Sequence, residues 1–288
     1  MRCLVTGHKG YIGAHLLKKL RSLGHQVVGV DFANDPQQNL LYCLENNPHY
    51  ISFRPEYIFH LACIPRVGYS VEEPVLTMQN NVISTTKVLD FAKKVKAKRV
   101  VYSGSSSVVG DGSGPNSPYG LQKLVSEMEC KLYSELYGLD TVTLRYFNVY
   151  SPDQKAEGAY ATAVSNFMQH IRDNKNPFIT GDGEQRRDMA NVKDVVSANI
   201  FAMEYEENFN GRYFDIGTGD NISMNEIAQI VKKHFPKVEF SYVEPRKGDV
   251  LYTKADMSPI EKFGWKPQIE ITKGVEECFE KLKNEIKE

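Results

Sequence analysis

The first 31 residues constrain the fold of this chain more than any other stretch. Residues 2–6 (RCLVT) form an apolar run of strand length, and glycines follow at positions 7, 10 and 13. Apolar residues then recur at helical spacing up to Gly24, and a second apolar run, residues 26–30 (QVVGV), ends at Asp31. This order of strand, glycine turn, helix, strand and acid predicts a βαβ unit that binds a dinucleotide.

The glycine turn has a specific chemical use. Gly7, Gly10 and Gly13 allow the backbone to approach a pyrophosphate, which lies at the positive end of the following helix. Asp31 is placed to accept hydrogen bonds from the adenosine ribose hydroxyls, and its charge repels a 2′-phosphate. The stretch therefore favours NAD over NADP. A plain tight turn accounts for the glycines alone, but not for the strands, helix and acid around them.

The composition limits the partners. The 288 residues allow one large domain or two modest ones, and 35 basic against 36 acidic residues give a formal net charge of -1. Such a chain has no overall positive field for nucleic acid or an anionic membrane. Its five scattered cysteines, without a C-x-x-C pair, indicate reduced thiols rather than disulfides or a zinc site. The start is too glycine-rich for a signal peptide, and no apolar stretch reaches the ~18 residues of a membrane helix. We expect a cytoplasmic protein with no metal site that binds neither nucleic acid nor membrane.

A second pattern carries candidate chemistry. Tyr119 and Lys123 are four residues apart in a stretch that reads as a helix, which brings their Cβ atoms within about 5–6 Å. An ammonium beside a phenol lowers the phenol's pKa and can make it a base near neutral pH. Alone, the pattern is common, and a surface helix with a half-buried tyrosine is the alternative.

Nine further segments match one family. They are YIFHLAC (57–63), SVEEP (70–74), NNVISTTKVLDFAKK (80–94), RVVYSGSSSVVG (99–110), SPYGLQKLVSEM (117–128), LRYFNVYSP (144–152), GDGEQRRDMANVKDVVSANI (181–200), FDIGTGDNISMNEI (214–227) and PRKGDVLYTKAD (245–256). Together with the G-x-x-G-x-x-G turn, they resemble the extended short-chain dehydrogenase/reductase family over almost the whole chain. The resemblance is to its NAD-dependent nucleotide-sugar epimerase/dehydratase branch, closest to UDP-glucose and UDP-N-acetylglucosamine 4-epimerases. Ser84 and Ser151 replace glycines of the family pattern.

The resemblance implies an α/β fold, a doubly wound parallel Rossmann sheet with a smaller, discontinuous C-terminal substrate domain. We expect the NAD-binding domain at 1–153 and 183–222 and the nucleotide-sugar-binding domain at 154–182 and 223–288. Segments near 187–217 are expected to return to the main sheet. Helices at 75–97 and 119–137 match the pair that forms a four-helix homodimer interface in relatives; two solvent-facing helices are the alternative.

One stretch departs from the family. Residues 32–54 are fewer than relatives use for the adenine pocket. A compressed helix and strand are expected there, with a weaker or differently seated cofactor.

The resemblance also implies roles for individual residues. Tyr119 is the acid/base, Lys123 binds the nicotinamide ribose, and the Ser105 hydroxyl bonds the reacting sugar oxygen. Arg187 and Arg246 supply forked donors for phosphate oxygens. The implied cofactor contacts are Gly7, Gly10, Tyr11, Ile12, Gly13, Asp31, Leu61, Ala62, Asn81, Ser103, Tyr119, Lys123 and Tyr146. The implied substrate contacts are Ser105, Ser107, Tyr119, Asn148, Tyr160, Arg187, Arg246, Asp249 and Thr253.

The serine loop narrows the reaction. Dehydratases of this branch carry Thr-Asp-Glu where this chain has Ser105-Ser106-Ser107, so elimination lacks its acid and base. Transient oxidation remains: Tyr119 takes the proton of a hexose 4-hydroxyl, hydride passes to NAD, and hydride returns to the other face of the 4-keto sugar. We therefore expect a UDP-hexose or UDP-N-acetylhexosamine 4-epimerase, with CDP, GDP and dTDP left open as the nucleotide.

Three further expectations follow. Thr253 occupies a position where epimerases restricted to plain hexoses tend to hold tyrosine, which predicts room for an N-acetyl group. Epimerisation at C2 or at C3 and C5 and a 4-reductase are the enzymatic alternatives; Cys63 is in the right neighbourhood for a second acid, although the family usually has alanine there. A catalytically silent NAD(P)-binding regulatory protein is the other class, and the intact Ser105, Tyr119 and Lys123 argue against it.

Overall fold

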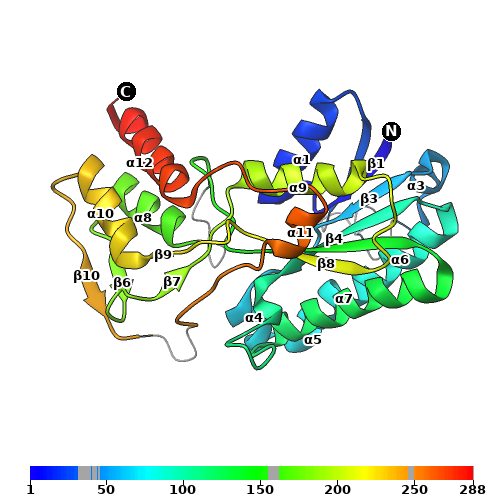
Figure 1. Cartoon of the computed structure of the whole chain (residues 1–288), viewed down its shortest axis with the longest axis horizontal. Coiled ribbons are helices and arrows are strands. Elements are labelled where there is room, and N and C mark those ends of the chain that lie inside the picture. Colours follow the sequence, from blue (N-terminus) through cyan, green and yellow to red (C-terminus); the bar gives the residue numbers. More distant parts are fainter. Residues whose placement is uncertain (32–39, 41–43, 45, 155–161, 246–249, 288) are drawn as a thin grey trace. The chain divides into compact units, whose positions relative to one another are not determined.

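The computed structural model describes residues 1–31, 40, 44, 46–154, 162–245 and 250–287 (Figure 1). The chain forms two compact units. The first comprises Met1–Tyr146 and Val195–Asp215, and the second comprises Phe147–Asp194 and Ile216–Glu288. The segment that returns to the first unit is thus shorter than the predicted 183–222, and the first crossing follows Tyr146 rather than residue 153.

A six-stranded sheet forms the centre of the first unit. Its strands are β1 (Arg2–Thr6), β2 (Gln26–Val30), β3 (Tyr57–His60), β4 (Arg99–Ser105), β5 (Asp140–Tyr146) and β8 (Arg212–Ile216), in the order β2-β1-β3-β4-β5-β8. Strands β1 to β5 pair in parallel. The chain leaves β1 first to one side and then to the other, and ligands of open α/β sheets bind beyond the strand ends at such a reversal. The sheet confirms the predicted doubly wound Rossmann fold.

Helices cover both faces of this sheet. They are α1 (Tyr11–Ser22), α3 (Pro48–Phe53), α4 (Val67–Glu72), α5 (Pro74–Met78), the π-helical η2 (Gln79–Ile83), α6 (Ser84–Val95), the 3-10 turn η3 (Ser106–Val108), α7 (Pro118–Tyr137) and α9 (Val192–Glu204). Helices α1 and α9 lie on one face, and α4 to α7 lie on the other (Figure 1). The helices predicted at 75–97 and 119–137 are present, the first as the continuous run α5, η2 and α6.

Local sequence sets the bounds of α7, which carries the Tyr/Lys pattern. The Ser117 hydroxyl accepts a hydrogen bond from the Gly120 N–H, and Pro118 occupies the first helical position. Gly138 ends the helix with φ +65°, a conformation that glycine adopts without strain. Tyr119 and Lys123 therefore lie in its first turns.

The shortened stretch is only partly described. Between β2 and β3 the described residues form α3 and no strand, whereas residues 32–39, 41–43 and 45 lie outside them. The predicted compressed helix is present as α3. The expectation about the adenine pocket concerns residues that lie outside the described part of the chain.

The second unit packs helices on one core. Its elements are α8 (Ala163–Arg172), β6 (Phe178–Thr180), β7 (Arg186–Arg187), β9 (Ile222–Ser223), α10 (Met224–His234), β10 (Ser241–Val243), α11 (Ser258–Lys262) and α12 (Ile271–Lys287). Fully buried Met168, Ile227 and Phe279 join α8, α10 and α12. Strand β6 pairs with β10, and β7 pairs with β9.

The prediction for residues 187–217 is therefore right for β8 and wrong for β7. Strand β7 pairs antiparallel with β9 outside the main sheet. Its neighbour Asp188 is fixed to the Thr218 backbone of the second unit, which holds the strand there. Among the described residues, no helix combines the length and apolar content that a membrane crossing requires.

Candidate cofactor and substrate sites

The glycine turn after β1 leaves no room for side chains. Gly7 has φ +70°, and a Cβ there would lie 2.7 Å from the Ala62 nitrogen. A Cβ at Gly13 would lie 2.1 Å from the Gly7 oxygen. Helix α1 begins after Gly10 without a side-chain cap, so its first N–H groups face the turn. This backbone cradle at a helix N-terminus fits a dinucleotide pyrophosphate.

Asp31 is held against the same turn. Its carboxylate accepts a hydrogen bond of 2.7 Å from the Lys9 N–H, and its Oδ2 lies 3.9 Å from His8 Nδ1. The His8 ring packs on Gly29, where a Cβ would come within 2.3 Å of it. The carboxylate thus lies beside the glycine turn at the end of β2, where the adenosine ribose lies in βαβ nucleotide sites.

Ser105, Tyr119 and Lys123 meet in one buried cluster. Tyr119 is hydrogen-bonded to Ser105 and interacts electrostatically with Lys123. Lys123 is 2% exposed, and its Nζ donates to the Ser103 carbonyl at 2.6 Å. The end of β4 and the first turns of α7 therefore bring the three predicted catalytic side chains together.

Burial decides the charge of Tyr119. Burial raises the pKa of Tyr119 well above its ordinary value, while Lys123 and the Ser105 hydrogen bond act in the opposite direction. For Lys123, burial lowers the pKa, but Cys63 and Tyr119 outweigh it, and the net shift is upward. The predicted lowering by Lys123 exists but is smaller than the effect of burial. The chain alone therefore favours a neutral phenol beside an ammonium, and the role of Tyr119 as a base stays a prediction.

Ser107 extends the cluster. Its N–H and its hydroxyl both donate to Ser105 Oγ, at 3.2 and 2.8 Å. Because Ser105 accepts both, its own hydroxyl hydrogen is available to donate onward. The turn η3 offers hydroxyls and no carboxylate to this cluster.

Six further predicted cofactor contacts lie at the end of β3, at the start of α1 and beside the cluster. Ser103 and Tyr146 bond to each other at 3.1 Å. The Leu61 N–H donates to the Thr6 carbonyl, and the Ala62 N–H donates to the Thr6 hydroxyl, so both residues lie at the carboxyl end of β3. Tyr11 and Ile12 open helix α1.

Asn81 lies differently from the other predicted contacts. Its amide is bonded to both backbone groups of Ile64 and to Gln122 Oε1. The side chain is therefore engaged by the protein rather than free for a ligand.

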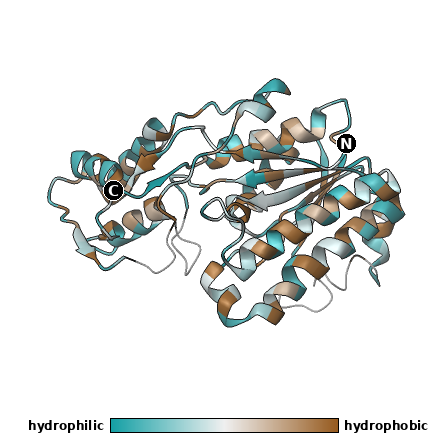
Figure 2. Cartoon of the chain, turned by 60° about the horizontal axis from the view of Figure 1, so that its bottom comes forward, coloured by the Kyte–Doolittle hydropathy of each residue, from teal (hydrophilic) through white to brown (hydrophobic). Residues whose placement is uncertain are grey.

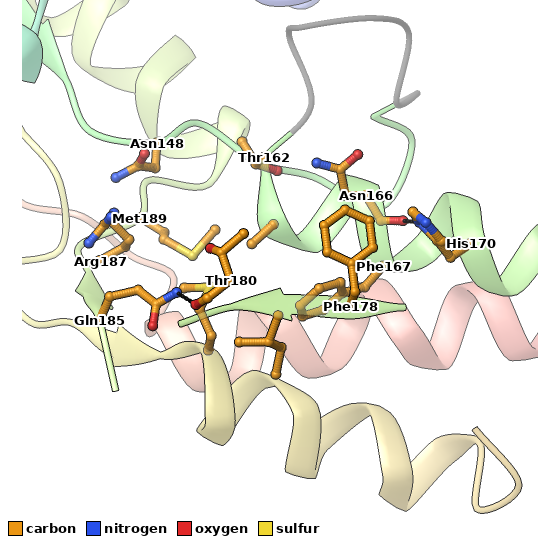
Figure 3. A pocket seen from close by; sticks show the side chains of 13 residues that line it. Asn148, Thr162, Asn166, Phe167, His170, Phe178, Thr180, Gln185, Arg187 and Met189 are labelled. Atoms are coloured by element: carbon orange, nitrogen blue, oxygen red, sulfur yellow. Dashed lines mark hydrogen bonds between the residues drawn. The ribbon is translucent and has the colours of Figure 1, made fainter. Parts of the chain in front are cut away.

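The second unit contains a cavity of about 280 Å³ (Figure 3). Its described lining is Asn148, Thr162, Ala163, Asn166, Phe167, His170, Phe178, Ile179, Thr180, Gln185, Arg187, Met189 and Met224. Asn148 and Arg187 lie at one end, and His170 and Phe178 lie at the other (Figure 3). The two rings meet edge to face, with centroids 5.6 Å apart. The cavity thus has a cationic end and an aromatic end.

Asp188 organises the cationic end. Its side chain is fully buried, and its carboxylate accepts hydrogen bonds from Thr218, Gly219 and Ala255. Its carbonyl accepts from Asn148 Nδ2 at 2.7 Å. Burial raises the pKa of this carboxyl, although its hydrogen bonds oppose the shift. Asp188 thereby fixes the backbone that carries Arg187.

Thr253 belongs to the same network. Its carbonyl and hydroxyl both accept from the Asp188 N–H, at 3.0 and 3.1 Å. The described residues that line the cavity do not include Thr253. Tyr160, Arg246 and Asp249, the other predicted substrate contacts, lie outside the described residues.

The sequence profile of the NAD dependent epimerase/dehydratase family matches residues 3–217. The chain belongs to the NAD-dependent epimerase/dehydratase family. The match spans the glycine turn, the Ser105 cluster and Arg187.

Relatives of this epimerase/dehydratase chain extend over its full length. UDP-glucose 4-epimerase of Mycolicibacterium smegmatis is 31% identical and covers 99% of each chain. The structure of Thermotoga maritima UDP-glucose 4-epimerase with UDP-glucose superimposes with a TM-score of 0.90 at 31% identity, over 99% of this chain and 100% of that one. UDP-N-acetylglucosamine 4-epimerase of Methanobrevibacter ruminantium, in complex with UDP-N-acetylmuramic acid, gives 0.86 at 30% identity over 97% of each.

The aromatic end of the cavity in this epimerase/dehydratase has little signal in the sequence. His170 and Phe178 stand in no motif of the sequence, and only the cavity unites them. Asn166 lies in GAYATAVSNFM (158–168), a segment that resembles the substrate side of UDP-N-acetylhexosamine 4-epimerases. Gln185 does carry a signal, because it lies within GDGEQRRD; its amide donates to the Thr180 carbonyl at 2.8 Å.

Proposed function

We propose that the chain is an NAD-dependent 4-epimerase of a UDP-sugar, acting on a UDP-hexose or a UDP-N-acetylhexosamine. The observation that carries the proposal is the buried cluster of Ser105, Tyr119 and Lys123, with hydroxyls and no carboxylate in the adjoining turn η3. Such a cluster moves one proton at one oxygen and has no group for elimination. The relatives named above act on UDP-glucose and UDP-N-acetylglucosamine.

The side chains divide the work at the reacting carbon. When bound, NAD supplies the reversible two-electron oxidation of the sugar's C4. Tyr119 takes the proton of the 4-hydroxyl, and the buried Lys123 ammonium stabilises the phenolate that this requires. Ser105 donates to the same sugar oxygen, since its own hydroxyl hydrogen is not used by Ser107. After the keto sugar turns, Tyr119 gives the proton back to that oxygen.

The cavity of the second unit suits a nucleoside diphosphate. Arg187 offers a forked donor for phosphate oxygens beside the Asn148 amide. Phe178 and His170 offer aromatic edges and faces to a base at the other end. Arg246, Asp249 and Tyr160 complete this site in the proposal. Thr253, bonded to Asp188, is proposed to leave room for a 2-N-acetyl group.

The decisive experiment incubates the purified protein with UDP-glucose, UDP-N-acetylglucosamine and UDP-glucuronate and separates the products. Conversion to the C4 epimer supports the proposal. Net reduction, a C2 epimer or a 3,5 epimer supports the alternative reactions, and no conversion supports a silent nucleotide-binding protein. Tyr119→Phe is expected to lower kcat by about 10²–10⁴-fold. The control Tyr137→Phe, on the same helix with its side chain half exposed, is expected to leave kcat unchanged.

We also propose a homodimer through the helices that cover one face of the sheet. Exposed apolar side chains follow the outer face of α7 at Leu121, Met128, Leu132 and Leu136, each at least 48% exposed. Val75 and Ile83 continue the surface on α5 and η2. Figure 2 shows hydrophobic residues along these helices. A contiguous apolar surface of this kind marks a protein interface. A cytoplasmic location is proposed as well, because the described cysteines are free thiols.

A further inference from the structure

A chain of buried polar side chains starts beside the glycine turn. Thr6 Oγ1 lies 2.7 Å from His60 Nδ1 and accepts a hydrogen bond from the Ala62 N–H at 3.2 Å. On the other side of the ring, His60 Nε2 lies 3.0 Å from Thr85 Oγ1. Thr85 in turn donates to the Asn81 carbonyl at 2.7 Å. Thr6, His60 and Thr85 are at most 1% exposed.

The hydrogen positions in this chain follow from its ends. A carbonyl oxygen only accepts, so the Thr85 hydroxyl hydrogen points to Asn81, and Thr85 Oγ1 must accept from His60 Nε2–H. Because Nε2 then carries the hydrogen of a neutral ring, Nδ1 is the acceptor and Thr6 donates to it. The tautomer is thus assigned from the network. Every polar atom of the three side chains has a partner in this arrangement.

The chain continues to the catalytic helix through Asn81. Its Nδ2 donates to Gln122 Oε1 at 2.7 Å, and Gln122 Nε2 donates to Thr77 Oγ1 at 2.9 Å. Asn81 also bonds both backbone groups of Ile64, at 2.7 and 3.2 Å. Gln122 is 1% exposed and directly precedes Lys123 in α7. One hydrogen-bonded path therefore joins β1, the residues after β3, the π turn η2 and α7.

We propose that Gln122 and His60 are positioning residues. His60 is held as the neutral Nε2–H tautomer. Through Asn81, the two side chains tie the catalytic turn of α7 to the backbone of residues 61–64. The path is called the amide–imidazole relay below, and it comprises Thr6, His60, Thr85, Asn81, Gln122 and Thr77. A loosened relay lets the α7 turn move against the end of β3, and a shift of about 1 Å in a reacting group can cost about 100-fold in rate. The catalytic part rests on the proposed function; the tautomer does not.

The surroundings of His60 agree with a neutral ring. The Tyr102 ring lies 5.6 Å from it, and the Lys123 ammonium is the charged group that acts on it. Burial, and secondarily Lys123, lowers the pKa of His60 to about 3. An imidazolium would donate from Nδ1 to Thr6 Oγ1, and the Thr6 hydroxyl hydrogen would then lose the acceptor that the neutral ring provides.

The first test is a long-range proton–nitrogen NMR spectrum of the full-length protein labelled in its histidine rings, at neutral pH. The His60 signals are assigned by their loss in His60→Gln. We expect a neutral ring with the hydrogen on Nε2. An Nδ1–H tautomer or an imidazolium would overturn the proposal. This measurement needs no substrate.

The second test is Gln122→Met, which keeps the volume and removes both hydrogen bonds. With UDP-glucose and UDP-N-acetylglucosamine as probes, kcat is expected to fall about 10–100-fold with KM within about twofold, because binding groups are untouched. The control Gln169→Met removes a hydrogen bond to Asp173 on α8 and is expected to leave both constants unchanged. Unchanged kcat in Gln122→Met would overturn the positioning role.

Two further readouts keep these tests decisive. If Gln122→Met does not fold, Thr77→Val removes the acceptor of Gln122 Nε2 at constant size and is expected to lower kcat severalfold; no loss would count against the relay. If wild-type protein converts neither sugar, the proposed function is wrong, and the His60 spectrum alone judges the relay.

Discussion

Asp188→Asn is the substitution for which the structure gives the clearest magnitude. The carboxylate accepts four hydrogen bonds, from the Thr218 N–H and hydroxyl at 2.8 Å each and from the Gly219 and Ala255 N–H groups at 3.0 Å each. Asparagine keeps one oxygen and places an NH2 group against the two donors of the other. Two hydrogen bonds are lost, and two donors are left facing a donor.

The cost follows from these contacts. Each hydrogen bond to a charged acceptor contributes about 1.5–3 kcal/mol, so losing two costs roughly 3–6 kcal/mol. Removing a buried charge offsets part of this, since burial raises the pKa of the Asp188 carboxyl. We expect a net loss of about 2–4 kcal/mol in the free energy of unfolding of the second unit, a large share of the ~5–15 kcal/mol that stabilises a domain.

The chain contains its own probe for this unit. Trp265 is the single tryptophan and is 6% exposed, so its fluorescence in urea follows the second unit. Asp182→Asn is the control, because that carboxylate accepts from the Glu184 N–H at the surface and should cost below about 0.5 kcal/mol. UDP titration by calorimetry should show weaker binding for Asp188→Asn, since Asn148 and Arg187 lose their fixed backbone. Equal urea midpoints for the two variants would refute the reasoning.

Three other substitutions have distinct outcomes. Gly13→Ala forces a methyl to 2.1 Å from the Gly7 oxygen, so the turn must shift, and the purified protein should release less NAD on denaturation than wild type; equal NAD content would contradict the cradle. Met128→Glu places charges on the proposed interface and should convert a dimer to a monomer in light scattering, whereas a wild-type monomer would exclude that interface. Thr253→Tyr should lower kcat/KM for UDP-N-acetylglucosamine at least tenfold while sparing UDP-glucose, and equal losses on both would exclude a gate at this position.

The sequence predicted the first unit well for a physical reason. The apolar residues of 2–31 recur at the spacing of a buried strand and a buried helix, and glycine is required where two backbone segments come into contact. The fold of this stretch therefore depends on residues that are close in the sequence. Tyr119 and Lys123 share a helix face, which spacing alone reveals. Their protonation could not be predicted, because it depends on burial by residues distant in the sequence.

The fold and the cavity of the second unit were harder to predict from the sequence. Strand β7 has two residues, and its pairing with β9 depends on a contact between segments 35 residues apart, as in the Arg186–Asn221 hydrogen bond. The aromatic end of the cavity unites α8 and β6 without any spacing rule. Gln122 lies between Tyr119 and Lys123 in the sequence, and only the fold shows its partners Asn81 and Thr77.

The division of the chain into two units has a consequence for how such an enzyme can diversify. Ser105, Tyr119, Lys123 and the glycine turn all belong to the first unit, whereas the described lining of the cavity belongs entirely to the second. On the proposed function, mutations that alter the range of accepted nucleotides and sugars can therefore accumulate around α8 and β6 while the proposed proton-transfer residues stay under separate selection. In laboratory evolution, a library confined to Phe147–Asp194 and Ile216–Glu288 should yield variants with new substrates and an unchanged cofactor preference.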